Sequence, residues 1–183
     1  MSKELQTKRL LLKELTARDT GLFMDFLLRN KEFFRPWSPE YDKDYEYPDY
    51  HRKRLERSAA GSIDGSHYKF GIFHKDNLNR IIGSVSLSNI ITGPFSSCFL
   101  GYRVDRNENG KGIASEAINS IVKFAFEELS LHRIEANIMP QNKPTIRVAE
   151  KCGFVYECSS QKYLQINGVW EDHLHYVILN EKL

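Results

Sequence analysis

The chain has 183 residues, of which 41% are hydrophobic and 27% are charged, an ordinary balance for a globular protein. This length fits one core, so we expect residues 1–183 to form a single domain. The 26 basic and 24 acidic residues give a net charge of +2, which argues against direct DNA binding. Neither a secretory signal nor an apolar run of membrane-spanning length is visible, so we expect a cytoplasmic protein without membrane contact.

The three cysteines, Cys98, Cys152 and Cys158, are an odd number at no metal-like spacing. We expect them to be reduced thiols that fill apolar space. A nucleophilic cysteine would need a histidine and an orienting partner, and the sequence alone places neither.

The first third of the chain predicts one strand and two helices. The apolar run over 10–15 predicts a strand, and a capping-box pattern at 16–19 starts a helix whose apolar residues keep helical spacing to Leu27. The segment 33–48 is rich in aromatic residues and prolines, which excludes a long helix. It either lines a pocket or anchors itself to the core, and the two interpretations are equally supported. A second helix is expected over 50–60.

Strands follow over 68–73, 81–87 and 98–104, and a turn at 76–79 joins the first two. The residues from 113 to 129 predict a long helix, because their apolar side chains form one wide face.

The last third predicts a strand over 134–139, a helix over 142–152 and two closing strands. Pro144 near the start and Gly153 just past the end fit the helix boundaries. Asn167-Gly168 is a strong hairpin signal between the closing strands. The order β-α-α-β-β-β-α-β-α-β-β predicts an α/β (α+β) fold, in which helices pack on a mixed sheet.

The loop that enters the long helix carries the most chemical information. Gly110 and Gly112 let the backbone approach a ligand closely, and the free amides and dipole of a helix start favour an anion such as pyrophosphate. A plain helix-entry turn is the commoner reason for two such glycines. The pattern is neither a P-loop nor a dinucleotide-binding fingerprint, because the required Gly-Lys-Ser/Thr and third glycine are missing.

The surrounding segments favour a ligand-binding loop over a plain helix-entry turn. It resembles motif A of the GNAT superfamily, in which Gln/Arg-x-x-Gly-x-Gly/Ala binds the pyrophosphate of coenzyme A, and the segment from Asn142 to Phe154 is similar to motif B. Within the superfamily, the chain from Thr7 onward resembles the ribosomal-protein-alanine N-acetyltransferases. The segments that carry this resemblance are 30–37, 88–89, 100–102, 131–137 and 167–173.

The resemblance implies the GNAT fold, a mixed and mostly antiparallel sheet of about seven strands with about four helices packed on it. It also implies acetyl-CoA as cosubstrate and no metal. Asn107 stands where the motif has Gln or Arg, so phosphate binding would rely more on backbone amides, with Arg106 and Lys111 able to compensate. By position, the expected coenzyme-binding residues are Tyr102, Arg103, Val104, Asn109, Gly110, Lys111, Gly112, Ile113, Ala114 and Asn142.

The usual acid–base positions of the superfamily are vacant. Phe99 and Asn137 stand where members carry a glutamate, and Ala149 stands where they carry a tyrosine. The candidate catalytic residues are therefore Asn137 and the hydroxyls of Thr145 and Tyr163. Both hydroxyls have structural alternatives, as a first-turn helix residue and a cross-strand packing residue.

These vacancies bear on the acceptor. An α-amino group has a pKa of about 7.8, so roughly a tenth of it is neutral at pH 7, whereas a lysine amine with a pKa of about 10.4 is on the order of several hundred times scarcer in that form. A site that positions the reactants and passes a proton to water or asparagine suits an N-terminal amine better.

The acceptor is expected to bind between segment 33–47 and the closing hairpin. The carboxylates of this segment would steer a basic peptide to the site, unless they merely solvate a loop. His173 and His175 share a strand face, but two ligands without a third predict a packed pair and no metal site. The candidate acceptor-binding residues are Trp37, Glu40, Trp170 and His173.

We therefore predict direct acetyl transfer from acetyl-CoA to a primary amine in a ternary complex. The resemblance implies the N-terminal alanine of a ribosomal protein as the acceptor. Two alternatives stay open: a small amine such as a polyamine, amino acid or antibiotic, and a catalytically silent acyl-CoA-binding or ribosome-associated module. The sequence leaves the oligomeric state open, with a homodimer as one alternative.

Overall fold

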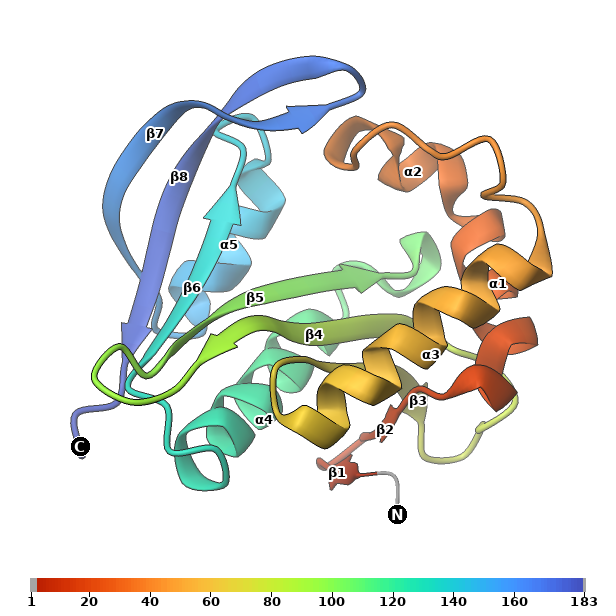
Figure 1. Ribbon diagram of the computed structural model, residues 1–183, viewed down its shortest axis with the longest axis horizontal. Helices are drawn as coiled ribbons and strands as arrows, with labels where there is room; N and C mark the ends of the chain where they lie inside the picture. The colour runs from red at the N-terminus through yellow and green to blue at the C-terminus, as the bar shows by residue number, and fades with distance from the viewer. Residues whose placement is uncertain (1–2, 183) are drawn as a thin grey trace.

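The computed structural model describes residues 3–182 as one eight-stranded sheet with helices on both faces (Figure 1). None of the helices in this range is long and apolar enough to cross a membrane. The strands are β1 (Glu4–Gln6), β2 (Leu10–Glu14), β3 (Tyr68–His74), β4 (Gly83–Ile91), β5 (Ser97–Val104), β6 (Arg133–Ile138), β7 (Val155–Ile166) and β8 (Val169–Leu179). The α-helices are α1 (Thr20–Arg29), α2 (Lys31–Phe34), α3 (Pro48–Asp64), α4 (Ile113–Glu127) and α5 (Lys143–Lys151), and the 3₁₀ helices are η1 (Ala17–Asp19), η2 (Arg35–Trp37) and η3 (Arg106–Glu108).

The sheet divides at its middle. The strand order is β1-β2-β3-β4-β5-β6-β8-β7, and β5 and β6 form its parallel pair. Their register covers only Ser97–Phe99 against Arg133–Glu135. Beyond these residues the two strands continue to Val104 and Ile138 and diverge, as Figure 1 shows. Two halves of one sheet therefore enclose a wedge of space.

Two hydrophobic cores cover the two faces of the first half. Alternate residues of a strand face opposite sides, so Ile72 of β3 packs in the core beneath α4 and its neighbour Phe73 packs with α1 and α3. The apolar face predicted for the long helix is confirmed, since Ile118 and Ile121 of α4 are almost completely buried.

The predicted fold class is confirmed, with eight strands and five α-helices instead of about seven and four. The sequence missed β1 because an alternation over three residues is too short to give a strand signal. The segment 33–48 was expected to be a loop, but it begins with α2 and η2. Helix α3 also runs further in both directions than 50–60, because Pro48 fits a first helical position and Gly65 adopts the left-handed conformation that ends a helix.

A buried carboxylate fixes the end of β5 to α1. Asp105 is 1% exposed and accepts hydrogen bonds from Arg29 Nε at 2.8 Å, Arg80 Nη2 at 3.3 Å and the backbone amide of Asn107 at 3.0 Å. Burial raises the pKa of Asp105, but these hydrogen bonds and charges outweigh burial and hold the pKa below its ordinary value. The glycine loop, which carries Gly110 and Gly112, therefore starts from a rigid point.

Replacing Arg29 by Met should lower the free energy of unfolding by about 3 kcal/mol at pH 7, because the Asp105 carboxylate then stays buried with less compensation. The folded-state pKa of Asp105 is depressed, so this contribution is present above the unfolded pKa of about 3.9 and is lost as the pH falls through the folded value. In urea titrations, the stability gap between the two proteins should therefore start to narrow below about pH 4 and shrink further as the pH falls towards the folded pKa. Arg18→Met, which changes an exposed side chain of η1, is the control and should change stability by less than about 0.5 kcal/mol. An equal gap between wild type and Arg29→Met at pH 7 and pH 3 would contradict this assignment.

Candidate active site

A cleft of about 430 Å³ opens where β5 and β6 diverge. The two strands line its base, the first turns of α4 and α5 contribute to its walls, and residues of α2, η2, β7 and β8 close it on the other side. Residues far apart in the sequence therefore meet at one place, as the site prediction required.

The β7–β8 hairpin is tied to the segment after α2 across the cleft. Asn167 donates from Nδ2 to the carbonyl of Arg35 at 2.8 Å, and its backbone amide donates to the carbonyl of Ser38 at 3.3 Å. Asn167 and Gly168 have φ values of 46° and 78°, which is what a two-residue type I′ turn demands. Figure 1 shows the hairpin tip reaching towards α2 above the diverging strands.

The start of α4 has the properties of an anion site. Gly110 and Gly112 both adopt left-handed backbone conformations, with φ values of 78° and 77°. No acceptor within residues 3–182 takes a hydrogen bond from the backbone amides of Gly112, Ile113 and Ala114, and no side chain caps the helix. These free donors, together with the helix dipole, can hold a phosphate group.

The open edge of β5 lies along the same cleft. From Leu100 to Val104 this strand pairs with β4 but not with β6. Its free side can therefore pair with an extended chain that carries amide groups. At the base of the cleft, the hydroxyl of Tyr102 donates to the carbonyl of Thr145 at 3.4 Å, and burial raises the pKa of Tyr102. Asn142 accepts from the amide of Thr145 at 3.3 Å and so caps α5.

Asn137 and Tyr163 meet beside the cleft. Asn137 lines it and donates from Nδ2 to the Tyr163 hydroxyl at 3.3 Å, whereas its buried Oδ1 has no hydrogen-bond partner among the described residues. A buried carbonyl oxygen without a partner is unfavourable, so this atom is ready to accept a hydrogen bond from a bound ligand. Burial, with a contribution from Glu135, raises the pKa of Tyr163, which keeps its hydroxyl protonated at neutral pH.

A hydrogen-bonded chain behind Tyr163 was not foreseen. His175 Nδ1 lies 2.7 Å from Glu135 Oε1, and His175 Nε2 lies 2.8 Å from Ser160 Oγ. The Tyr163 ring packs edge-on against His175, with 4.9 Å between ring centroids. Burial raises the pKa of Glu135, but hydrogen bonds from His175 and Arg133 outweigh it and lower the pKa overall. This chain holds Tyr163 in place.

The sequence signal for this chain was the spacing of His173 and His175 on one strand face. The partners Glu135 and Ser160 could not be read, because they come from two other strands. Within residues 3–182 no group of three or more His, Cys, Asp or Glu side chains could hold a metal ion.

The cleft brings together most of the predicted site residues. Gly110, Lys111, Gly112 and Ile113 form the loop and helix start between Asn109 and Ala114, and Tyr163 reaches the cleft through Asn137. The predicted residues that line the cleft are Trp37, Tyr102, Arg103, Val104, Asn109, Ala114, Asn137, Asn142, Thr145 and His173.

Two predicted acceptor-binding residues lie outside the cleft. Trp170 is 57% exposed and pairs with Gln165 near the hairpin tip. Glu40 lines two neighbouring hollows instead, one of which is rich in basic side chains. Glu40, one of the carboxylates expected to steer a basic peptide, therefore lies beside the cleft and not in it. The segment that carries Glu40 packs against the first turn of α3 through Tyr45 and His51.

The comparisons with known proteins agree with this geometry. Residues 9–155 match the family model of the acetyltransferase (GNAT) domain. The chain belongs to the GNAT family. It is 40% identical over 176 residues to the probable N-acetyltransferase YjcK of Bacillus subtilis, which covers 96% of this chain and 97% of the relative.

Two further GNAT proteins are similar to this chain over most of its length. The [ribosomal protein uS5]-alanine N-acetyltransferase of Escherichia coli is 34% identical over 170 residues, covering 93% of this chain and 87% of the relative. The structure of Mycobacterium smegmatis RimJ in complex with CoA-disulfide superposes with a TM-score of 0.89 at 27% identity, over 100% of this chain and 88% of that chain. The resemblance to ribosomal-protein-alanine acetyltransferases is confirmed, and the chain is an acetyl-CoA-dependent N-acetyltransferase.

Gly110→Asp should raise the Kd for acetyl-CoA at least tenfold in calorimetry, because it adds a negative charge next to the free amides of α4. Gly93→Asp is a matched control. It lies in the β4–β5 loop with a φ value of 77°, and a Cβ atom meets nothing within 4 Å at either glycine. Both variants carry the same backbone strain of about 1–2 kcal/mol. Equal acetyl-CoA affinities in the two variants would remove the glycine loop from the coenzyme site.

Proposed function

We propose that this GNAT acetyltransferase moves the acetyl group of acetyl-CoA directly to the N-terminal amine of a protein in the cytoplasm, with the N-terminal alanine of a ribosomal protein as acceptor. The unpaired Oδ1 of Asn137, a residue that lines the cleft, carries this proposal, because an amine N–H would supply the partner that this oxygen lacks. The E. coli relative, at 34% identity, supports the acceptor class.

The coenzyme would lie along the diverging strands. Its pyrophosphate would accept hydrogen bonds from the free amides of Gly112, Ile113 and Ala114. Its pantetheine arm would pair with the open edge of β5 over Tyr102 to Val104 and end near Asn142. This course supports the proposal, because it brings the thioester to the part of the cleft that Asn137 and Thr145 line.

The transfer needs little acid–base assistance. The neutral amine attacks the thioester carbonyl, the C–N bond forms and the C–S bond breaks, and the proton of the amine passes to water. Asn137 Oδ1 would accept a hydrogen bond from the amine and orient it. The hydroxyl of Tyr163 or Thr145 would donate to the departing sulfur, and burial keeps the Tyr163 proton available at neutral pH.

The cysteines support transfer in a ternary complex without an acetyl-enzyme. Burial raises the pKa of Cys98 to about 12 and also raises that of Cys152, so neither forms a thiolate readily. Cys158 is exposed on β7, and both ring nitrogens of its cross-strand neighbour His175 are engaged by Glu135 and Ser160 instead. Direct attack of the amine on the coenzyme is therefore the simpler route.

The acceptor class can be tested with purified protein and two sets of amines. We expect acetylation of peptides that begin with alanine, detected by mass spectrometry, and kcat/KM for spermidine, free amino acids and aminoglycosides at least a hundredfold lower. Peptides blocked at the N-terminus but carrying lysine are the control and should stay unmodified. Preferred acetylation of a small amine would replace the proposed acceptor, and tight acetyl-CoA binding without any product would favour a catalytically silent module.

Asn137→Ala should lower kcat for an alanine peptide about tenfold, because one hydrogen bond of roughly 1–1.5 kcal/mol to the reacting amine is lost. The acetyl-CoA Kd should stay unchanged. Asn137→Asp keeps an acceptor oxygen and should retain more activity than Asn137→Ala. Equal kcat in all three proteins would show that this side chain does not touch the reacting amine.

A further inference from the structure

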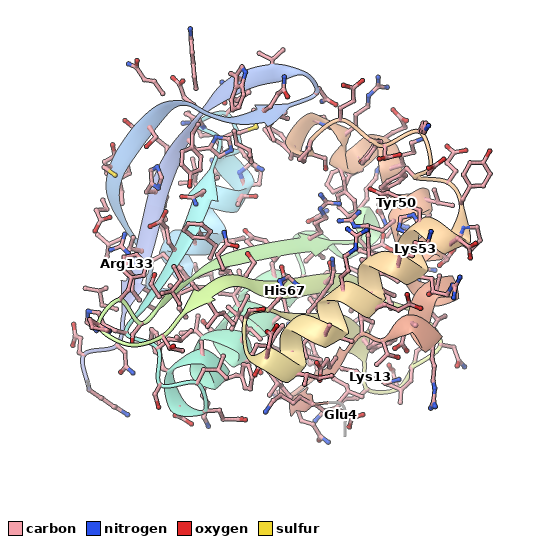
Figure 2. All side chains as sticks on the ribbon, in the orientation of Figure 1. Glu4, Lys13, Tyr50, Lys53, His67 and Arg133 are labelled. Atoms are coloured by element: carbon pink, nitrogen blue, oxygen red, sulfur yellow. The ribbon has the colours of Figure 1, made fainter. Side chains whose placement is uncertain are left out.

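A second cavity of about 440 Å³ lies next to the cleft, between α3 and the segment from Ser38 to Tyr45. The two spaces share Ser38, Pro39 and Arg103 in their linings. Figure 2 shows Tyr50 and Lys53, which line this cavity, on the N-terminal half of α3. The second cavity therefore borders the cleft directly, with Ser38, Pro39 and Arg103 between the two spaces.

The cavity carries more positive than negative charge. Its lining contains four basic side chains, which outnumber the two carboxylates of Glu40 and Asp42. Within residues 3–182 none of the four forms an ion pair. By contrast, Arg52 of the same helix α3 pairs with Asp49 at 3.1 Å and with Glu56 at 3.6 Å. The basic residues of the lining are Lys53, Arg54, Arg57 and Arg103.

Two of these cations contact neutral groups only. Arg103 donates from Nη2 to Ser38 Oγ at 3.1 Å, and its guanidinium lies 5.4 Å from the centroid of the Phe34 ring. The guanidinium of Arg54 lies 5.4 Å from the centroid of the Tyr50 ring. Aromatic faces position a guanidinium but leave its charge without a counter-ion, so these groups can still bind an anion.

A hydroxyl without a partner completes the lining. Tyr45 is 4% exposed, and its Oη, which lies near the Arg103 guanidinium, donates to no acceptor among the described residues. Burial raises the pKa of Tyr45 to about 12, so this group is an O–H donor at neutral pH. A buried donor left unpaired is as unfavourable as an unpaired acceptor, and an anionic ligand would satisfy it.

The pKa of the nearby Lys69 of β3 responds to the surplus positive charge of this cavity. Burial, together with the positive charges of Arg54 and Arg103, lowers the pKa of Lys69 to about 7. Its ammonium nitrogen lies 4.9 Å from the centroid of the Phe23 ring, another neutral contact. The region between α3 and the sheet therefore holds cations whose balancing charge is missing from the described residues.

We propose that this cavity binds an acidic side chain of the acceptor, so that the preferred acceptor is a polypeptide with Asp or Glu within a few residues of its N-terminal amine. The proposal rests on the function proposed above. A carboxylate can accept two parallel hydrogen bonds from a guanidinium such as Arg103 or Arg54 and a third from Tyr45 Oη. An extended chain advances roughly 3.3 Å per residue, so a residue shortly after the amine reaches a cavity that borders the cleft. The acidic residues within 40–44 had suggested a basic peptide as acceptor. This proposal replaces it with an acidic one.

The test compares alanine-initiated peptides that differ only in whether their second to fifth residues include Glu, Gln or Lys. For the wild type we expect kcat/KM at least tenfold higher with Glu than with Lys. Arg54→Gln combined with Arg57→Gln should raise KM for the Glu peptide about tenfold. It should leave KM for the Gln peptide and the Kd for acetyl-CoA unchanged. Arg52→Gln, whose charge is already paired on the same helix, should behave as the wild type.

A binding measurement separates this inference from the proposed function. Calorimetric titration of the Glu and Lys peptides into the CoA-loaded protein should show tighter binding of the Glu peptide, whether or not turnover occurs. Preferred binding without acetylation would overturn the proposed function and keep the acidic-ligand site. Acetylation of all peptides with equal kcat/KM and equal affinity would overturn the inference and keep the proposed function. A Glu preference that survives in the double variant would also overturn it, because the carboxylate would then bind elsewhere.

Discussion

The short parallel contact between β5 and β6 is the constraint on which the rest of the molecule depends. Only three residue pairs join the strands before they diverge, so one edge of β5 stays open in the middle of the sheet. An open strand edge exposes unpaired backbone groups, which proteins normally cover. Here only η3 and the loop with Gly110 and Gly112 separate β5 from the start of α4, and the same opening therefore offers free strand groups and free helix amides side by side. A coenzyme with amide and phosphate groups satisfies both.

Two of the three unpaired buried polar side-chain atoms in residues 3–182 lie beside this opening. Asn137 Oδ1 and Tyr45 Oη belong to residues that line the two adjoining cavities, whereas His51 Nδ1 lies outside both linings. Folding alone would favour pairing such groups. Their positions fit one extended acceptor, whose amine would meet Asn137 and whose following acidic residue would meet Arg54, Arg103 and Tyr45.

With the proposed N-terminal acceptor, the missing glutamates and tyrosine of the superfamily would have a physical explanation. An N-terminal amine already has a sizeable neutral fraction near pH 7, so the site gains more from orientation than from a strong base. The chain of Glu135, His175 and Ser160 contributes rigidity, since it fixes the strands on which Asn137 and Tyr163 stand. Under the proposal above, specificity for the acceptor would come from the cationic cavity, which lies outside the reacting centre.

The sequence by itself determined the family, the element order and the glycine loop, because apolar periodicity, Asn167-Gly168 and the motif around Gly110 are local signals. The short β1 and the helices α2 and η2 escaped it, since segments of three or four residues carry no periodicity. Tertiary structure decided which charged side chains face each other. Glu40 lies between η2 and α3 in the chain. It nevertheless lines a cavity with Lys53, Arg54 and Arg57 of α3 and with Arg103 of β5. The charge of a binding surface is a sum over distant segments, and only folding brings them together.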